Sequence, residues 1–271
     1  MSRQTGRSPL GATTNPDTKL ARVREILTDL VKEQQSLDQF LQKISPREWG
    51  KATAVEGWSI QDLVSHLAQF EDLVAESVED GVDPNVTVAE HGSFEAFVAS
   101  GTAKGAEMRP QDVIEWWRLS RARAMDALWA RESSDRVMWL GGECSARLMA
   151  TYRIMETWAH GLDVWDVMGD EEHPVPETDR LRHIAFLAHR LLPLAFERAG
   201  ETYAEVRIEV MGPDYAKWSF GPEGAPRIKG PAMQFARLAV QRSTLEACPD
   251  LTAEAEPAER ALRLVTAYLT P

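Results

Sequence analysis

The segment METWAHGLDVWDVMG, residues 155–169, decides how the middle of this chain folds. On a helix, Glu156 and His160 lie one turn apart, at about 40° from each other, and point the same way. Trp, Val, Leu and Met surround them on nearly all sides, which is typical of a helix enclosed by its neighbours. A buried carboxylate is costly unless a charge or a hydrogen-bond donor meets it, so this pair needs a partner.

Apolar residues at helical spacing predict further helices on both sides of this one, which we expect over 144–168. Ser59 is the expected N-cap of one of them, with Asp62 three residues later as its capping-box partner. The predicted helices are 18–44, 59–79, 93–101, 110–131 and 177–199. We expect 80–92 and 133–144 to be connecting segments. Mostly short connections favour antiparallel neighbours and an up-and-down helical bundle.

The pattern changes after residue 200. Residues 205–210 alternate apolar and charged side chains, which predicts a half-buried strand, and 217–221 alternate again after a Gly-Pro-Asp turn. Together they predict a β-hairpin, and 226–230 a third short strand. Two more helices are expected over 231–247 and 257–269, each with Pro near its start.

The fold class that follows is α+β. We predict a disordered N-terminus over 1–17, a helical bundle over 18–200 and a small C-terminal α/β domain over 201–271. The length of 271 residues is enough to bury a substantial core.

Composition restricts the partners. The net charge of −12 comes without any basic segment, so we expect neither nucleic acid nor a membrane surface as a partner. Cys144 and Cys248 stand far apart and outside any CxxC pattern, which favours a reducing compartment. With no signal-peptide core and no apolar run long enough to span a bilayer, the expected location is the cytoplasm.

A third polar residue belongs with the pair on 144–168. His66 lies towards the edge of the apolar arc of the helix 59–79. Taken separately, Glu156 and His160 are an ion pair and His66 a hydrogen-bonded core residue more often than ligands. Taken together, two imidazoles and a carboxylate are a standard three-ligand set for a divalent transition metal such as Zn²⁺, with open positions left for water or substrate. Asp163, on the same face, is placed to orient a ligand from behind.

Aromatic residues are candidates for the wall of a pocket beside these groups. Trp58 and Trp139 are the two that we expect to contact a substrate, together with Trp158 and Trp165 as further wall residues. The alternative is that they are core residues, as most of the nine tryptophans must be.

Two segments, EGWSIQDLVSHLAQFE (56–71) and RIMETWAHGLDVWDVMG (153–169), resemble the signature segments of DinB-like metal-binding bundle proteins. The closest resemblance is to the actinobacterial branch that contains mycothiol-dependent maleylpyruvate isomerase. Residues 206–243 resemble the companion domain of a subgroup called wyosine-base-formation-like.

The resemblance implies a function. Family members bind a divalent metal, usually zinc, through a set that corresponds to His66, Glu156 and His160. They use it to activate a low-molecular-weight thiol such as mycothiol, for cis–trans isomerisation or S-transfer on a small substrate. Arg242 is the nearest match to an arginine on which the isomerase relies, so the resemblance makes it a candidate catalytic residue.

Other functions stay open at this point. An open zinc site can activate water instead of a thiol, which would make the protein a metal-dependent hydrolase. The chain could also be a non-catalytic, metal-stabilised scaffold, or a protein that binds a small apolar ligand. The expected assembly is a monomer or a homodimer.

Overall fold

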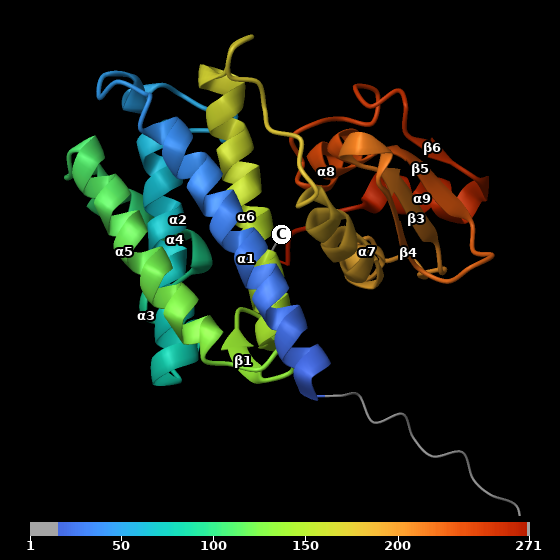
Figure 1. Ribbon diagram of the computed structural model, residues 1–271, viewed down its shortest axis with the longest axis horizontal. Helices are drawn as coiled ribbons and strands as arrows, with labels where there is room; N and C mark the ends of the chain where they lie inside the picture. Colours follow the sequence, from blue (N-terminus) through green and yellow to red (C-terminus); the bar gives the residue numbers. More distant parts are fainter. Residues whose placement is uncertain (1–15, 270–271) are drawn as a thin grey trace, which may run out of the picture.

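The central helix α6 (Ala146–Met168) runs through a helical bundle in the computed structural model, which describes residues 16–269 (Figure 1). The predicted disordered segment 1–17 lies outside the described residues, except for its last two, which belong to α1. The other helices of the bundle are α1 (Pro16–Leu41), α2 (Ile60–Ala75), α3 (Pro84–Glu90), α4 (Phe94–Ala106) and α5 (Pro110–Trp129). Within the bundle, α1 packs on α6, while α2 packs on α4, α5 and α6.

Local sequence signals explain where α2 begins and ends, and the apolar composition of α6 explains its burial. Ser59 caps α2 in a capping box with Asp62, as predicted. A π-helical turn, Glu76–Asp80, extends α2 until Gly81 ends it with φ 71°. In α6 nearly every residue from Met149 to Trp165 is buried, which confirms that this helix is enclosed.

The segment 80–92, predicted to be a connection, contains the short helix α3. Asp83 accepts a hydrogen bond from the backbone N–H of Asn85, and Pro84 occupies the first helical position. Both are helix-start signals, which the absence of an apolar stripe had masked.

The segment 133–144 was also predicted to be a plain connection, yet it folds as a β-hairpin. Its strands are β1 (Arg136–Trp139) and β2 (Gly142–Ser145), with Val137 opposite Cys144. Gly141 and Gly142 take positive φ angles of 79° and 129° at the turn, which only glycine adopts easily.

The C-terminal part contains a four-stranded sheet of order β4-β3-β5-β6. The strands are β3 (Arg207–Met211), β4 (Lys217–Phe220), β5 (Arg227–Pro231) and β6 (Thr252–Ala253). The predicted hairpin is confirmed, because β3 and β4 pair antiparallel, and β5 is the predicted third strand, parallel to β3. Ile208 and Val210 are buried while Arg207 and Glu209 are half-exposed, as the alternation predicts.

Three helices accompany the sheet: α7 (Leu181–Arg198), α8 (Ala232–Ala239) and α9 (Ala255–Leu264). Both C-terminal helices end earlier than predicted. Gln241, with φ 58°, reverses the chain just after α8, and Val265 is extended after α9. After each of these two helices the chain returns towards the bundle. The last described residues, which follow α9, lie between α6 and α7 (Figure 1).

Helix α7 packs on α6 and also on α8, α9 and the sheet, so it contacts both parts of the chain. A single hydrophobic cluster includes buried side chains of α6, α7 and the sheet. The predicted domain boundary at residue 200 therefore follows a helix that is shared by both parts, and the boundary stays a prediction.

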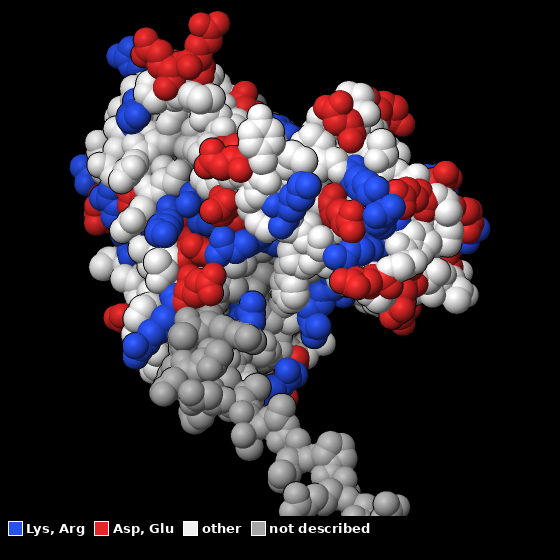
Figure 2. Space-filling view, turned by 45° about the vertical axis from the view of Figure 1, so that its right-hand side comes forward, with Lys and Arg blue, Asp and Glu red and all other residues white. Residues whose placement is uncertain are grey.

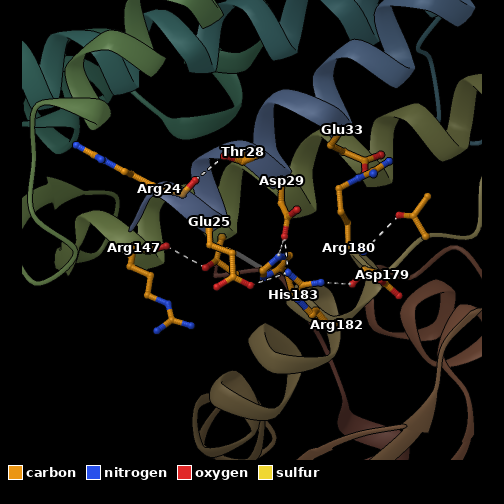
Figure 3. Close-up of polar contacts among 12 residues, drawn as sticks. Arg24, Glu25, Thr28, Asp29, Glu33, Arg147, Asp179, Arg180, Arg182 and His183 are labelled. Carbon is orange, nitrogen blue, oxygen red and sulfur yellow. Dashed lines mark hydrogen bonds and ion pairs between the residues drawn. The ribbon is translucent and has the colours of Figure 1, made fainter. Parts of the chain in front are cut away.

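A group of charged side chains joins α1 to the start of α7 (Figure 3). We call it the α1–α7 cluster; its members are Asp29, Glu33, Arg180, Arg182 and His183. Asp29 accepts hydrogen bonds from Arg182 at 2.6 Å and from His183 at 2.8 Å, and Arg180 pairs with Glu33. Each carboxylate of the cluster is thus paired with at least one Arg or His side chain, and each Arg or His with a carboxylate.

On the face shown in Figure 2, positive and negative side chains are interspersed. Within residues 16–269, none of the helices combines the length and apolar character that crossing a membrane requires.

Candidate functional site

Helices α2 and α6 bring His66, Glu156 and His160 together. The Nε2 atoms of His160 and His66 lie 3.4 Å and 3.9 Å from Oε2 of Glu156. One potential ligand atom from each residue lies within 4.8 Å of the other two. Both histidine rings are buried, and the Glu156 side chain is 20% exposed.

These separations are long for hydrogen bonds, which are normally about 2.7–3.2 Å between heavy atoms. Ligand atoms bound to one tetrahedral Zn²⁺ at about 2.0–2.2 Å lie about 3.3 Å from each other. The 3.4 Å separation matches this spacing, and the other two, 3.9 Å and at most 4.8 Å, are longer. The three side chains thus converge on one point without forming normal hydrogen bonds to one another.

Aromatic rings hold the two imidazoles in place. The ring of Trp58 lies 5.1 Å from that of His66 and 6.0 Å from that of His160, measured between centroids. Phe70, one turn after His66 on α2, packs against the His66 ring at 4.4 Å. These contacts are between ring faces and edges, so they restrict rotation of the two imidazoles.

A chain of polar contacts supports His160 from behind. Its Nδ1 lies 3.3 Å from Asp163, one turn further along α6, and a carboxylate can only accept this bond. Arg242, in the turn after α8, donates from Nε at 2.5 Å and from Nη2 at 2.8 Å to the two oxygens of Asp163. Asp163 is fully buried, so the C-terminal part of the chain neutralises a charge inside the bundle.

The electrostatics of the site follow from burial and from these neighbours. Burial lowers the pKa of His66 to about 4, so this ring is neutral at physiological pH. Burial alone would raise the pKa of Glu156, but the two adjacent imidazoles outweigh it and hold that pKa well below its usual value. Burial opposes charge on His160 too, yet Asp163 and Glu156 raise its pKa.

A cavity of about 310 Å³ opens beside the three residues, within the range of small-molecule sites. Trp58 and Trp139, the two predicted substrate contacts, both line it, whereas Trp158 and Trp165 are buried outside its lining. Trp165 stacks on Phe40 in the bundle core. The turn after α8 and the chain after α9 complete the cavity with Gln241, Arg242, Tyr268 and Leu269.

Apart from Trp158 and Trp165, the structure brings the predicted site residues to one place: His66, Glu156 and His160 at the centre, Asp163 behind His160, and Arg242, Trp58 and Trp139 in the lining. It adds polar residues that the sequence interpretation missed. Arg153 and Tyr268 line the cavity, and the buried Nη1 and Nη2 of Arg153 and hydroxyl of Tyr268 have no hydrogen-bond partner. Arg153 could have been predicted from the sequence, because it lies one turn before Glu156 on the same face of α6.

Comparisons with known proteins identify the family of this chain. A family model described as the mycothiol maleylpyruvate isomerase N-terminal domain matches residues 11–165, which include His66, Glu156 and His160. Two uncharacterised proteins of Mycobacterium tuberculosis, from two strains, are each 32% identical over 249 residues, covering 90% of this chain and 95% of their own.

Solved structures show a shared fold. Crystal structures of the mycothiol-dependent maleylpyruvate isomerase and of a histidine-to-alanine mutant of it match with a TM-score of 0.57 at 18% identity. Each match covers 87% of this chain and 95% of the other. Since the family model spans more than half of the chain, and relatives at 32% identity span nearly all of it, the chain belongs to the mycothiol maleylpyruvate isomerase N-terminal domain family.

Proposed function

We propose that this protein is a metal-dependent enzyme that uses a low-molecular-weight thiol, such as mycothiol, for isomerisation or S-transfer on a small electrophilic substrate. The observation that carries the proposal is the convergence of His66, Glu156 and His160 within 4.8 Å of one another at the wall of a cavity. Membership of a family named for a mycothiol-dependent isomerase supports the thiol.

The donor set fits a divalent metal such as Zn²⁺. Two imidazole nitrogens and one carboxylate oxygen are borderline and hard ligands of the kind that zinc takes in open, catalytic sites. Burial lowers the pKa of His66, and a neutral imidazole has a lone pair on one ring nitrogen; the tautomer with its proton on Nδ1 would offer that lone pair at Nε2, the atom that faces Glu156. The ion would supply a Lewis acid that lowers the pKa of a thiol bound to it.

The protein's own residues then have separate tasks. Asp163 fixes the ring of His160, because the Nδ1–H must donate to it and Nε2 is left facing Glu156. Arg242 acts through Asp163: Nε and Nη2 bind that carboxylate and Nη1 donates to the carbonyl of Val240. We therefore assign Arg242 a positioning role rather than direct contact with the substrate.

The cavity wall places apolar surface beside the reacting groups. Trp58, Phe70, Trp139 and Met155 present apolar surface beside the three central residues. Apolar surface at this place favours addition of a thiolate to a conjugated double bond over competing reactions with water. Rotation about the former double bond and elimination of the thiolate complete a cis–trans isomerisation without net change in atoms or electrons.

The test is a metal analysis followed by a turnover assay. We expect the protein, purified without a His-tag, to contain about one zinc or other divalent metal per chain, as a three-ligand site requires. With metal present, mycothiol should support isomerisation of maleylpyruvate or conjugation of a related electrophile. Protein without metal, or metal-loaded protein that hydrolyses substrates or stays inactive regardless of thiol, would overturn the proposal in favour of a hydrolase or a non-catalytic protein.

A further inference from the structure

One buried arginine beside the candidate metal centre has hydrogen bonds left to make. Arg153 is 1% exposed, yet of its three nitrogens only Nε has a partner, Oε1 of Glu71 at 3.2 Å. Nη1 and Nη2 are buried and unpartnered, which leaves four N–H donors without an acceptor. An unsatisfied buried donor typically costs about 1–3 kcal/mol, so a second partner is expected.

The pairing with Glu71 does not account for this geometry. An arginine placed only to neutralise a carboxylate usually binds it with two parallel N–H groups. Here the same Glu71 oxygen also accepts from Gln34 at 3.1 Å, and the far side of the guanidinium is left free. Arg242 shows the contrast, because all three of its nitrogens have acceptors.

The free donors belong to a residue that lines the cavity. Arg153 is part of the same wall as Glu156 and His160. It precedes Glu156 by three residues on α6, which is a rise of about 4.5 Å along the helix. Nη1 and Nη2 are themselves covered, so a small molecule bound beside Glu156 and His160 reaches these donors only when the side chains over them move aside.

We propose that Arg153 is an anion-binding residue of this cavity and holds a carboxylate of the substrate through Nη1 and Nη2. The inference rests on the proposed function for the identity of the reaction, but the anion site itself depends only on the guanidinium and the cavity. The planar fork of an arginine matches the two oxygens of a carboxylate, which favours this anion over a spherical one.

The charges around the cavity agree with an anionic ligand. Arg153 is balanced by Glu71 and Arg242 by Asp163, which leaves Glu156 as the remaining charge among these groups. A divalent cation on Glu156 and two neutral histidines leaves one positive charge in excess. An anionic substrate is thereby attracted to a cavity in a protein whose overall charge is −12.

The experiment is calorimetric titration of zinc-loaded protein with small carboxylates, namely acetate, pyruvate, maleate and succinate, and with uncharged maleamide as the comparison. We expect at least one carboxylate to bind and maleamide to bind at least about tenfold more weakly, since each lost charge-assisted contact is large. Arg153→Met should weaken carboxylate binding at least about tenfold while the zinc content stays the same. Anions held by the metal alone would bind equally well to this variant.

Two further variants keep the result interpretable. Arg153→Met leaves Glu71 as a buried unpaired charge, so the double variant Arg153→Met/Glu71→Gln should fold where the single one does not. Arg121→Met is the matched control, because Arg121 pairs with Asp38 and lies over Trp117, outside the cavity lining.

The outcomes separate this inference from the proposed function. Carboxylate affinity that is unchanged in the folded double variant, or no carboxylate binding by the wild-type protein, overturns the anion site. If the protein takes up no metal, the proposed function fails. Titration of the metal-free protein then tests whether the Arg153 guanidinium binds a carboxylate against the charge of Glu156, so the two failures are distinguishable.

Discussion

Two buried polar clusters in this molecule differ in how completely their groups are paired. In the α1–α7 cluster, Asp29 and Glu33 meet Arg180, Arg182 and His183, and no buried nitrogen or oxygen of these five side chains lacks a partner (Figure 3). The second cluster, which we call the cavity cluster, consists of His66, Arg153, Glu156, His160 and Asp163 on α2 and α6; in it, Nδ1 of His66 and both Nη atoms of Arg153 are unpartnered. A fully paired cluster holds helices together, whereas the unpartnered donors beside the cavity are groups that a bound ligand would satisfy.

The largest effect is expected when the histidine that contacts an aspartate in each cluster is replaced by alanine. His160 and His183 are both buried beside an aspartate, at 3.3 Å and 2.8 Å. We expect His160→Ala to abolish thiol-dependent turnover and to weaken metal binding by more than about 100-fold, beyond the effect typical of an outer-shell partner. His183→Ala should lower stability and leave the metal affinity unchanged.

Elemental analysis and chelator competition measure the metal affinity, and circular dichroism verifies that each variant is folded. Equal metal loss in both histidine variants would show that the two clusters do not differ in function.

The next largest effect concerns the paired cluster. Glu33→Ala leaves Arg180 largely buried without its carboxylate and should destabilise the protein by about 3 kcal/mol, the low end for a broken buried ion pair. Replacing both residues, Glu33→Leu/Arg180→Leu, should cost less than the single change because no charge is stranded. Urea unfolding measures both. If the double variant is less stable than Glu33→Ala, the pair is not the structural contact that we describe.

A smaller effect is expected at Asp163, the residue of the cavity cluster whose two oxygens both accept hydrogen bonds. Asp163→Asn keeps the size of the side chain but weakens the contacts with His160 and Arg242. Loss of an outer-shell carboxylate typically costs about 10–100-fold in metal affinity, so we expect a change in this range. Arg242→Gln should give a change of the same kind, with thiol binding to metal-saturated protein preserved. An Asp163→Asn protein with wild-type metal affinity would contradict the positioning role.

The sequence predicted the elements whose signals are local. The stripes of α1, α2, α5 and α6, the Ser59–Asp62 capping box and the β3–β4 alternation are all read from neighbouring residues. The β1–β2 hairpin was missed because its strands are only four residues long and a two-residue turn joins them. The early end of α8 was missed because Gln241 takes the left-handed conformation that glycine usually marks, with the Arg242 N–H bonded back to the carbonyl of Arg237. The early end of α9 was missed because no glycine or proline marks Val265, where the chain becomes extended.

The site was predictable to a similar extent. The spacing of Glu156 and His160 predicts that they share one face of α6, and the chemistry of His66 makes it a candidate third ligand. That His66 on α2 lies next to Glu156 is visible only in the structure. Tyr268 could not be predicted, since its position depends on how the last segment of the chain returns to the bundle. Whether a buried arginine is fully paired is likewise invisible in a sequence: Arg153 and Arg242 differ only in their surroundings.

The smallest effect is expected for a buried titratable group that belongs to neither cluster. Cys144 lies on β2, and burial raises the pKa of its thiol from 9.0 to about 11. The unfolded chain therefore loses this proton at lower pH than the native protein, so the unfolded state binds fewer protons above pH 9 and stability falls as pH rises. The contribution is complete below about pH 9 and is lost by about pH 11.

Cys144→Ala should accordingly leave thiol-dependent turnover at neutral pH unchanged. Between pH 8 and 10.5, its free energy of unfolding should fall less steeply than that of the wild-type protein, by a difference on the order of 2 kcal/mol at the alkaline end. Other alkaline groups titrate alike in both proteins and cancel in the difference. Parallel curves would mean that the thiol of Cys144 is accessible to water in the native protein. A loss of activity in Cys144→Ala would mean that this residue belongs to the candidate site, although it is a member of neither cluster.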